Sequence, residues 1–291
     1  MSITKETDLT GMHPIPNGDN GVWLSERGAE FNRIGGTRPE ERNVISANGK
    51  GGIVISSAAN VIRGNFIGTD ATGRAPLGNA GGGAGVGEGN IFGGTTPQEA
   101  NVVAASGWNG VGAGHNSIVV GNVIGTDPAS EVDMGNLGLG VICGGRTIIQ
   151  GNVIAHTKPR TGGGGTGIVT DSDARVTMRR NRVYDSAGAG IENGPQPPAP
   201  PVIVAATGFE VTGTACAGCE IEIFSDFEDE GRWFEGSTVA DASGHFAVRL
   251  RTLARGRNLT ATATDRMGST SRFSAPHPAP PRPLRRKLGP R

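Results

Sequence analysis

The chain repeats one polar phrase at long, nearly regular intervals, and this repetition constrains its fold more than any local pattern. Ile-Gly-Thr-Asp occurs at residues 67–70 and 124–127, and residues 7–11 begin an earlier copy. The threonine of the phrase falls at Thr7, Thr69 and Thr126, so the two intervals between copies are similar in length. Self-similarity at a fixed period indicates an architecture built by stacking one structural unit. A polar residue that recurs in every copy is therefore expected to hold the repeat together.

Each copy contains short apolar runs separated by Gly and Asn. Residues 44–45, 53–55 and 61–62 are such runs, and each is too short for a helix. Strands joined by tight turns at a spacing of roughly eight to twelve residues give this pattern. Glycine makes up 50 of the 291 residues, against a usual share of about 7%, which also favours turns. A sandwich has similar strands, but only a stacked coil makes the same phrase recur at the same step.

Aligning the copies on their Gly-Asn dipeptides places equivalent residues in columns. An aliphatic column is expected to form an interior stack, in which each buried branched side chain contributes about 1.5–3 kcal/mol. Its members are Ile67, Ile124, Ile154 and Val183. An asparagine column is expected to lie at a bend, where Asn tolerates the left-handed conformation, and to bond from coil to coil, while Gly64, Gly121 and Gly151 beside it are expected to supply positive φ. Its members are Asn65, Asn122, Asn152 and Asn181.

Residues 7–194 resemble bacterial right-handed parallel β-helix repeat proteins. The resemblance lies in Gly-Asn-x-Ile-Gly-Thr-Asp and in Ile-Gly-Gly-Thr followed by Arg-Asn-Val-Ile. It implies a solenoid over residues 1–194, with N-terminally truncated repeats. At roughly 20–25 residues per coil, we expect about eight coils. The fold hosts polysaccharide lyases, hydrolases, epimerases, adhesins and phage tailspikes, so the resemblance implies the fold without identifying an activity.

The composition and the hydrophobic pattern of the sequence change after the repeats. Residues 195–201 are rich in proline and are predicted to form a stiff linker. Residues 202–274 contain about seven runs, several of which alternate polar and apolar residues, as half-buried sandwich strands do. This stretch resembles the small immunoglobulin-like modules that follow β-helices in exported bacterial proteins. The predicted fold class is all-β, a parallel β-helix solenoid followed by a small β-sandwich, with a basic, disordered tail over residues 275–291.

Charge and hydropathy narrow the class of partner. The formal net charge is +0, whereas nucleic-acid-binding proteins usually carry a basic stripe, so no nucleic-acid partner is expected. No apolar run approaches the roughly 18 residues of a membrane span. The N-terminus lacks the features of a signal peptide and begins inside a repeat, so we expect a truncated chain of an extracellular or cell-surface protein. A polysaccharide or a cell-envelope component is the expected partner, and the oligomeric state stays open.

Cysteines and acidic residues offer few metal ligands. Cys216 and Cys219 form a lone Cys-x-x-Cys motif, which is compatible with a local disulfide or with two inert thiols, and zinc is not expected. Cys143 lies in an apolar run and is expected to be a small buried residue. An acidic run is interpreted as a solvated loop or as a weak calcium site without the EF-hand order of ligands. Its members are Asp226, Glu228, Asp229 and Glu230. No other cofactor is expected.

The strongest candidate for chemistry lies late in the repeats. His156 and Asp185 depart from the repeated pattern, and their spacing equals that between the Gly-Asn copies that precede them. If this spacing is one coil, they lie on adjacent strands about 5 Å apart, where a histidine beside a carboxylate can act as a general base. Arg179 aligns close to them. The alternative interpretation is a polar outer face with charge pairs. The candidate carbohydrate contacts are Trp23, Trp108, Arg182 and Tyr184.

Two functions stay open at the level of sequence. The leading hypothesis is a non-catalytic exported or surface repeat protein that presents a carbohydrate- or partner-binding face, with the sandwich as a spacer. The alternative is a polysaccharide lyase or epimerase that acts on an acidic, uronate-containing polymer through His156, Asp185 and Arg179. An enzyme requires side chains of several coils to converge on an acid–base pair, whereas a binding rod requires ladders and an accessible face.

Overall fold

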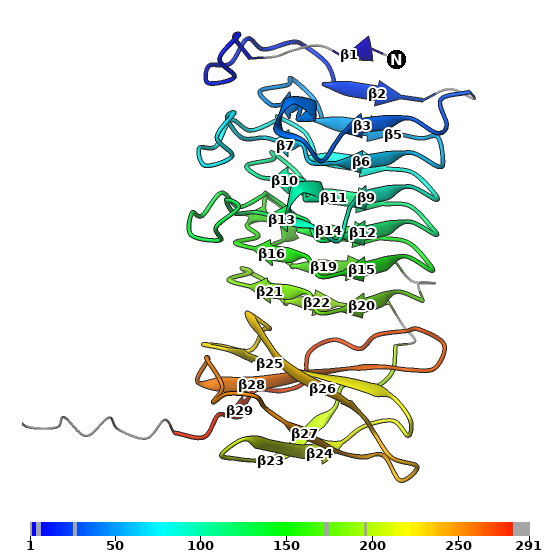
Figure 1. Ribbon diagram of the computed structural model, residues 1–291, viewed down its shortest axis with the longest axis vertical. Coiled ribbons are helices and arrows are strands. Elements are labelled where there is room, and N and C mark those ends of the chain that lie inside the picture. Colours follow the sequence, from blue (N-terminus) through cyan, green and yellow to red (C-terminus); the bar gives the residue numbers. More distant parts are fainter. Residues whose placement is uncertain (1, 4–6, 26–27, 172–174, 195–196, 282–291) are drawn as a thin grey trace, which may run out of the picture.

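The computed structural model describes residues 2–3, 7–25, 28–171, 175–194 and 197–281. Its regular structure is almost entirely β-strand, arranged as a parallel solenoid followed by two antiparallel sheets (Figure 1). The predicted fold class, a β-helix followed by a small sandwich, is confirmed. Helical structure in the described part consists of two single 3-10 turns, η1 (Pro39–Glu41) and η2 (Pro97–Glu99). Neither has the length or the apolar character that a membrane-spanning helix needs.

Three sheets form the sides of the solenoid, and we number them in the order in which the chain passes through them. The first sheet contains β1 (Ser2–Ile3), β2 (Val22–Leu24), β5 (Ile53–Ile55), β8 (Ala84–Val86), β11 (Val111–Ala113), β14 (Val141–Cys143), β19 (Ile168–Thr170) and β22 (Ile191–Glu192). The second contains β3 (Arg33–Gly35), β6 (Val61–Arg63), β9 (Ile91–Gly93), β12 (Ile118–Val120), β15 (Ile148–Gln150) and β20 (Thr177–Arg179). The third contains β4 (Val44–Ile45), β7 (Phe66–Ile67), β10 (Val102–Val103), β13 (Val123–Ile124), β16 (Val153–Ala155) and β21 (Arg182–Tyr184).

Each rung of the solenoid contributes one strand to every sheet, and the described residues contain six such rungs, from β2–β4 to β19–β21. In the first sheet, Val22 pairs with Ile53 on the next rung, and Val141 pairs with Ile168. Both pairs are separated along the chain by more than the expected length of a coil. A rung is therefore longer than the sequence suggests, and the expectation of eight coils is wrong. The strands themselves are short, and most of the extra length lies in the loops.

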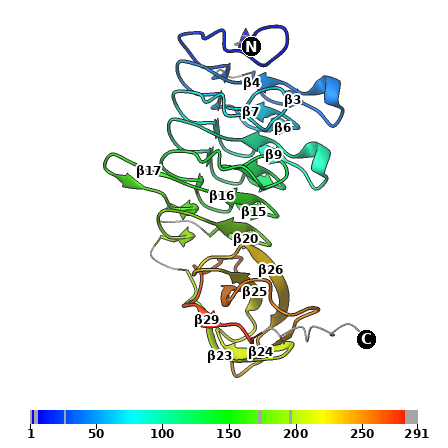
Figure 2. The ribbon, with the colours of Figure 1, turned by 90° about the vertical axis from the view of Figure 1, so that its left-hand side faces the viewer.

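The sequence repeat spans two rungs rather than one. A loop that starts with Gly-Thr-Asp leaves the solenoid after β7 and again after β13, and the bridges Thr69–Pro76 and Thr126–Asp133 close the two loops. Both project from the same side as the loop at residues 7–14 (Figure 1, left). The turns η1 and η2 also occur two rungs apart (Figure 2). Because long loops alternate from rung to rung, the period of the sequence is twice that of the coil.

The interior of the solenoid is a continuous apolar stack. In the third sheet, five fully buried residues are in register on successive strands: Ile67, Val103, Ile124, Ile154 and Val183. The predicted aliphatic column is confirmed, with Val103 as an additional member. Inward-facing residues of the other two sheets complete the same core.

Three asparagine ladders follow the bends of the solenoid. In the longest, each side-chain amide donates to the amide oxygen of the asparagine on the next rung, at 2.8–3.0 Å. Its members are Asn43, Asn65, Asn101, Asn122, Asn152 and Asn181. The shorter ladders consist of Asn17, Asn48 and Asn79, and of Asn32, Asn60 and Asn90.

The predicted ladder is confirmed, but its asparagines do not have left-handed backbones. Positive φ belongs to the preceding residue at four of the six bends, with values of 69°, 66° and 65° at Gly64, Gly121 and Gly151, as expected, and 53° at Arg180. The asparagines therefore act through their side-chain amides, and at these four bends the turn itself depends on the preceding residue.

The sandwich consists of two antiparallel sheets around a second apolar core. One sheet contains β23 (Val202–Thr207), β24 (Glu210–Thr214) and β27 (His245–Arg249). The other contains β26 (Trp233–Val239), β25 (Glu220–Asp226), β28 (Asn258–Thr264) and β29 (His277–Pro278). Cys216 and Cys219 form a disulfide between β24 and β25. The sequence predicts that residues 275–291 are disordered. This prediction is wrong at β29, where His277 pairs with Leu259. Residues 282–291 lie outside the described part of the chain.

The sandwich packs directly against the last rung. Val183 of β21 and Gly231 exchange two backbone hydrogen bonds, of 3.1 and 2.8 Å. Thr270 donates its backbone N–H to the carbonyl oxygen of Val176 at 3.0 Å, and Phe273 packs against the solenoid core. The Pro-rich segment 195–201, of which residues 195–196 are not described, therefore does not hold the two parts at a distance as a spacer would.

Candidate functional site

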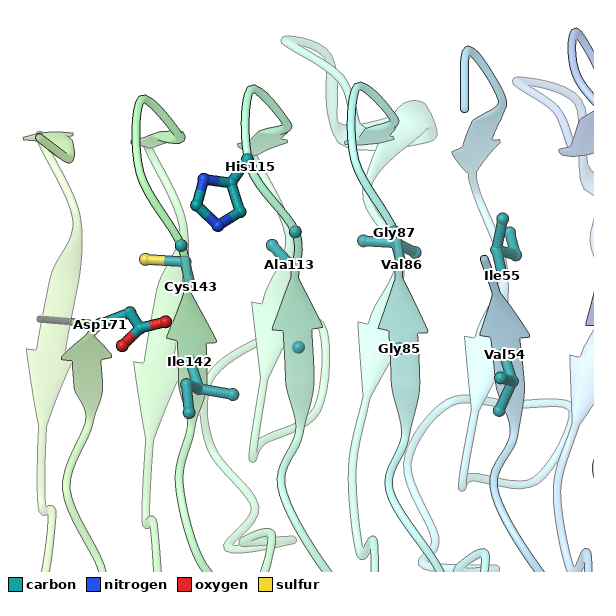
Figure 3. Close-up of a pocket in the computed structure, with 13 residues that line it drawn as sticks. Val54, Ile55, Gly85, Val86, Gly87, Ala113, His115, Ile142, Cys143 and Asp171 are labelled. Carbon is teal, nitrogen blue, oxygen red and sulfur yellow. The ribbon is translucent and has the colours of Figure 1, made fainter. Parts of the chain in front are cut away.

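The outer surface of the first sheet carries a column of residues, one from the middle of each three-residue strand. The register places Trp23, Val54, Gly85, Gly112, Ile142 and Val169 side by side on successive strands. The residues on either side of them in each strand point inward and are buried, as the alternation of a strand requires. Two neighbouring strands carry glycine in this column, so the surface is hollowed between Val54 and Ile142 (Figure 3).

Two adjoining hollows follow from this arrangement, and we call them together the glycine groove. One has a volume of about 420 Å³ and the other of about 370 Å³, and Val54, Gly85 and Gly112 line both. The groove runs across the strands, along the axis of the solenoid. Three inter-strand steps separate Val54 from Ile142, which corresponds to about 14 Å.

Nothing in the backbone or the packing requires glycine at the floor of the groove. A Cβ atom at Gly85 would lie 3.9 Å from the carbonyl oxygen of Ile53, and one at Gly112 would lie 3.8 Å from a methyl group of Ile142. These are ordinary van der Waals distances, and neither glycine has positive φ. Since Val54 and Ile142 occupy the same column, the strands accept branched side chains there. The two glycines therefore keep the surface open rather than satisfy the fold.

An exposed tryptophan borders the groove on one side. Trp108, which precedes β11, is 54% exposed and lines the groove together with Asn20, Lys50 and Asn109. The guanidinium of Arg160 lies 5.1 Å from the centroid of its ring. Trp23, which is 52% exposed, lies in the outer column on β2. Of the two tryptophans proposed from the sequence as carbohydrate contacts, Trp23 thus lies on the first sheet and Trp108 lies at the groove, in the loop before β11.

A histidine and a carboxylate lie toward the other side of the groove. His115 packs over Gly144, where an added Cβ would lie 2.9 Å from its ring, and Asp171 lines the same hollow (Figure 3). The thiol of Cys143 points into the core, and burial raises its pKa to about 12, so it stays protonated and unreactive. The expectation that Cys143 is a small buried residue is confirmed.

A polar hollow of about 550 Å³ adjoins the groove at His115. Arg146 and Arg175 line it from neighbouring rungs, and Glu88 lines it from the opposite side. The side-chain amide of Asn116 donates to Glu88 at 2.7 Å. Charges of both signs thus surround this hollow, whereas the floor of the glycine groove is apolar.

The structure brings His156 and Asp185 together, as their spacing in the sequence suggests. Val153 pairs with Arg182 and Ala155 with Tyr184, so the same spacing makes one rung at this point. The ring nitrogen Nδ1 of His156 lies 3.6 Å from a carboxylate oxygen of Asp185, and the side chain of His156 is 18% exposed. Arg232 of the sandwich lies closer to the same oxygen, at 2.9 Å. The pair therefore belongs to the boundary between the solenoid and the sandwich.

The other residues proposed for that site are occupied elsewhere. Arg179 forms an ion pair with Glu220 of the sandwich at 2.6 Å, and Arg182 donates to the carbonyl oxygen of Arg232. Tyr184 is 0% exposed, so it has no surface to offer a sugar ring. The grouping of Arg179 with His156 and Asp185, and the carbohydrate contact at Tyr184, are therefore corrected: the sandwich covers this face.

The acidic run does not converge on one point. Asp226 accepts hydrogen bonds from the backbone N–H groups of Glu228 and Arg232, while Glu230 accepts one from Ser186 across the domain boundary. Asp226 and Glu230 are buried, so the interpretation of the whole run as a solvated loop is wrong for these two. No group of three or more His, Cys, Asp or Glu side chains in the described ranges is arranged to hold a metal ion.

His115, Gly85 and Gly112 are not singled out by the sequence analysis. The signal that could have found them is the middle residue of each strand of the first sheet, read as a column. That column can be recognised only when every strand is assigned to its rung. The loops differ in length, so the sequence does not show this assignment.

Comparison with known proteins identifies the second part of the chain. A family model described as bacterial Ig domain matches residues 196–276, which covers the segment predicted to be immunoglobulin-like. A search of curated proteins finds no match to the chain.

Proposed function

We propose that this surface- or extracellular-type repeat protein, a parallel β-helix followed by an immunoglobulin-like module, is a non-catalytic binding protein whose glycine groove holds a stretch of an extended carbohydrate chain. One observation carries the proposal. Gly85 and Gly112 leave a hollow beside the exposed face of Trp108, although the fold would accept larger side chains at both positions.

The chemistry of the groove suits a chain of sugar rings. The apolar face of a sugar packs well on an indole ring, because such a ring offers a large, rigid surface at low cost in conformational entropy. Asn20, Lys50 and Asn109 place polar groups beside that surface, where hydroxyl groups of a ligand need partners. The groove is shallow and follows the solenoid axis, so an extended polymer fits it better than a compact small molecule does.

The same residues argue against hydrolysis in the groove. A glycosidase needs two carboxylates on either side of the scissile bond. Asp171 is the carboxylate among the residues that line the two hollows in the described part of the chain. Binding without turnover is therefore the function that this geometry supports best.

The test is affinity electrophoresis of the full chain in gels that contain neutral or uronate-bearing polysaccharides. We expect retardation by at least one polymer. Trp108→Ala removes the stacking surface and is expected to weaken binding by about 2 kcal/mol, roughly 30-fold. Gly112→Val fills the groove and is expected to abolish retardation while leaving the melting temperature unchanged.

Gln150→Val is the matched control, because Gln150 is an exposed strand residue on the second sheet. It is expected to bind as the unaltered chain does. Equal retardation of the Gly112→Val variant would exclude the groove as the binding site.

The alternative, a lyase or epimerase acting on a uronate polymer, has support from the 3.6 Å approach of His156 to Asp185. Incubating the full chain with the same uronate-bearing polysaccharides distinguishes this enzyme from a binding protein. Unsaturated product that forms with the unaltered chain and disappears with His156→Ala would establish an enzyme, whereas retardation without product supports the binding protein.

A further inference from the structure

The joint between the solenoid and the sandwich is rich in buried acid. β25 and β28 turn one face to the sandwich core and the other to the last rung, so residues on both faces are buried. Glu222 is 2% exposed and Glu230 is 5% exposed. Side chains and loops of the sandwich pack on the last rung, at the position where a further rung of the solenoid would otherwise stack.

Each of these two glutamates binds a backbone N–H group of the last turn. Glu222 accepts a hydrogen bond from the N–H of Arg180 at 2.8 Å, next to the end of β20. Glu230 accepts one from the N–H of Ser186 at 3.0 Å, just after β21. The two contacts hold two corners of the last rung, and the exchanged backbone hydrogen bonds of Val183 and Gly231 lie in the segment between them.

The surroundings of Glu222 favour its neutral form. Burial raises its pKa to about 7, against the opposing effect of the Arg180 N–H; the charge of Glu220 raises it further, and the charges of Arg180 and Arg179 lower it. Arg179 is already paired with Glu220 at 2.6 Å, at the rim of the joint.

Glu230 is in a similar position at the other corner. Burial raises its pKa to about 7; the N–H of Ser186 lowers it, and the charges of Asp226 and Asp229 raise it. Within the described residues, its oxygen Oε1 has no hydrogen-bond partner. An ionised carboxylate with an unpaired buried oxygen is costly, and protonation removes most of that cost.

A separate cluster of charged and polar side chains lies beside Glu230, around Asp185. Arg232 pairs with Asp185 at 2.9 Å, and His156 lies 3.6 Å from the same carboxylate. Arg182 donates to the backbone of Arg232 at 2.9 Å. None of these ion pairs includes Glu222 or Glu230.

We propose that the sandwich is a pH-sensitive cap on the β-helix: Glu222 and Glu230 clamp it to the last rung in mildly acidic surroundings, and the clamp weakens as the medium becomes neutral to alkaline.

The direction follows from proton linkage. When the sandwich leaves the last rung, water reaches both carboxyl groups and their pKa values fall toward the ordinary 4.5. Between that value and about 7, undocking releases protons, so rising pH favours the undocked form. A difference of about 2.5 units corresponds to a change of roughly 300-fold per carboxyl group in the ratio of docked to undocked molecules. Below the ordinary value, the contribution of both groups is constant.

Hydrogen–deuterium exchange of the full chain from about pH 5 to about pH 8.5, corrected for the intrinsic pH dependence of exchange, tests this proposal. We expect protection of the Val183 and Gly231 amides to fall more than about tenfold over this range, while amides of β11 and β14 stay protected. In the double variant Glu222→Gln, Glu230→Gln, protection is expected to be high and independent of pH, because glutamine accepts the same N–H groups and cannot ionise.

Two variants serve as controls. Glu210→Gln removes an exposed carboxylate of β24, in the other sheet of the sandwich, and is expected to keep the pH profile of the unaltered chain. His156→Gln removes the imidazole beside Asp185 and is expected to keep it as well. A flat profile in the unaltered chain overturns the proposal, whether or not the variants fold, and so does an unchanged slope in the double glutamine variant.

Discussion

At the scale of the residue, the asparagines of the long ladder replace backbone pairing at a bend where strands cannot continue. The side-chain amide of Asn122 donates to the carbonyl oxygen of Phe92 at 2.8 Å and to the amide oxygen of Asn152 at 3.0 Å. Its own amide oxygen accepts from the N–H and the side chain of Asn101. All of these groups are buried, so each needs a partner.

Replacing Asn122 should therefore be costly. Asn122→Ala leaves several buried groups unpaired on two neighbouring rungs, and each unsatisfied group costs about 1–3 kcal/mol. We expect a loss of at least about 2 kcal/mol in the free energy of unfolding, measured by urea denaturation. Gln150→Ala, an exposed change in the next rung, should cost less than about 0.5 kcal/mol. Equal losses in the two variants would show that the ladder bonds contribute nothing beyond strand propensity.

At the scale of the element, the Gly-Thr-Asp loops are small structures in their own right, and each is organised by its aspartate. Oδ1 of Asp70 accepts hydrogen bonds from the backbone N–H groups of Thr72, Arg74 and Ala75 and from the hydroxyl of Thr72. Arg74 reaches from this loop to Asp127, at 3.6 Å, in the loop two rungs later. The recurrence of the aspartate is therefore structural, as the repeat analysis predicts.

Acid should loosen these loops. Burial raises the pKa of Asp70, but the hydrogen bonds from Thr72, Ala75 and Arg74 together hold it below its ordinary value of 3.8. The stability that its carboxylate contributes is thus present above pH 3.8 and is lost as pH falls through the lower pKa of the folded state. Asp70→Asn keeps an acceptor and should remove this acid dependence, whereas Asp70→Ala should cost about 1–3 kcal/mol even at neutral pH. Denaturation curves at neutral and strongly acidic pH check both; an acid sensitivity that the asparagine variant retains in full must come from other groups.

At the scale of the whole molecule, the sandwich closes the solenoid. Alternation along β25 and β28 suggests one face in the core and one in water, but the second face is buried against the last rung. Contacts between Met178 and Thr270 and between Arg180 and Glu222 join segments 92 and 42 residues apart. The immunoglobulin-like module thus covers the exposed strand edges that a solenoid otherwise presents to other chains.

Removing that cover should change how the protein associates. A chain that ends at Gly194 exposes the edges of β20 and β21 and the apolar surface that Phe273 covers. We expect it to self-associate in sedimentation velocity at concentrations where the full chain keeps one constant sedimentation coefficient. A single species of constant size, with the melting temperature of the full chain, would show that the solenoid needs no cap.

The stacking of the rungs can be predicted from the amino-acid sequence, because register between rungs depends on repeated residues that must lie over one another. Ile67, Ile124 and Asn122 can be assigned to their columns from the repeated phrases alone, whatever the lengths of the loops between them. The sequence did not determine the length of a rung, since loops on alternate rungs change the spacing without disturbing the register.

The positions of the glycine groove and of the joint, in contrast, become apparent only in the folded chain. Gly85 and Gly112 are unremarkable among 50 glycines until they stand next to each other in one sheet. The sequence suggests an accessible ring at Tyr184, whereas in the structure the sandwich buries it. The physical reason is that burial and hollows depend on contacts between residues with no repeated spacing, and such contacts leave no periodic trace along the chain.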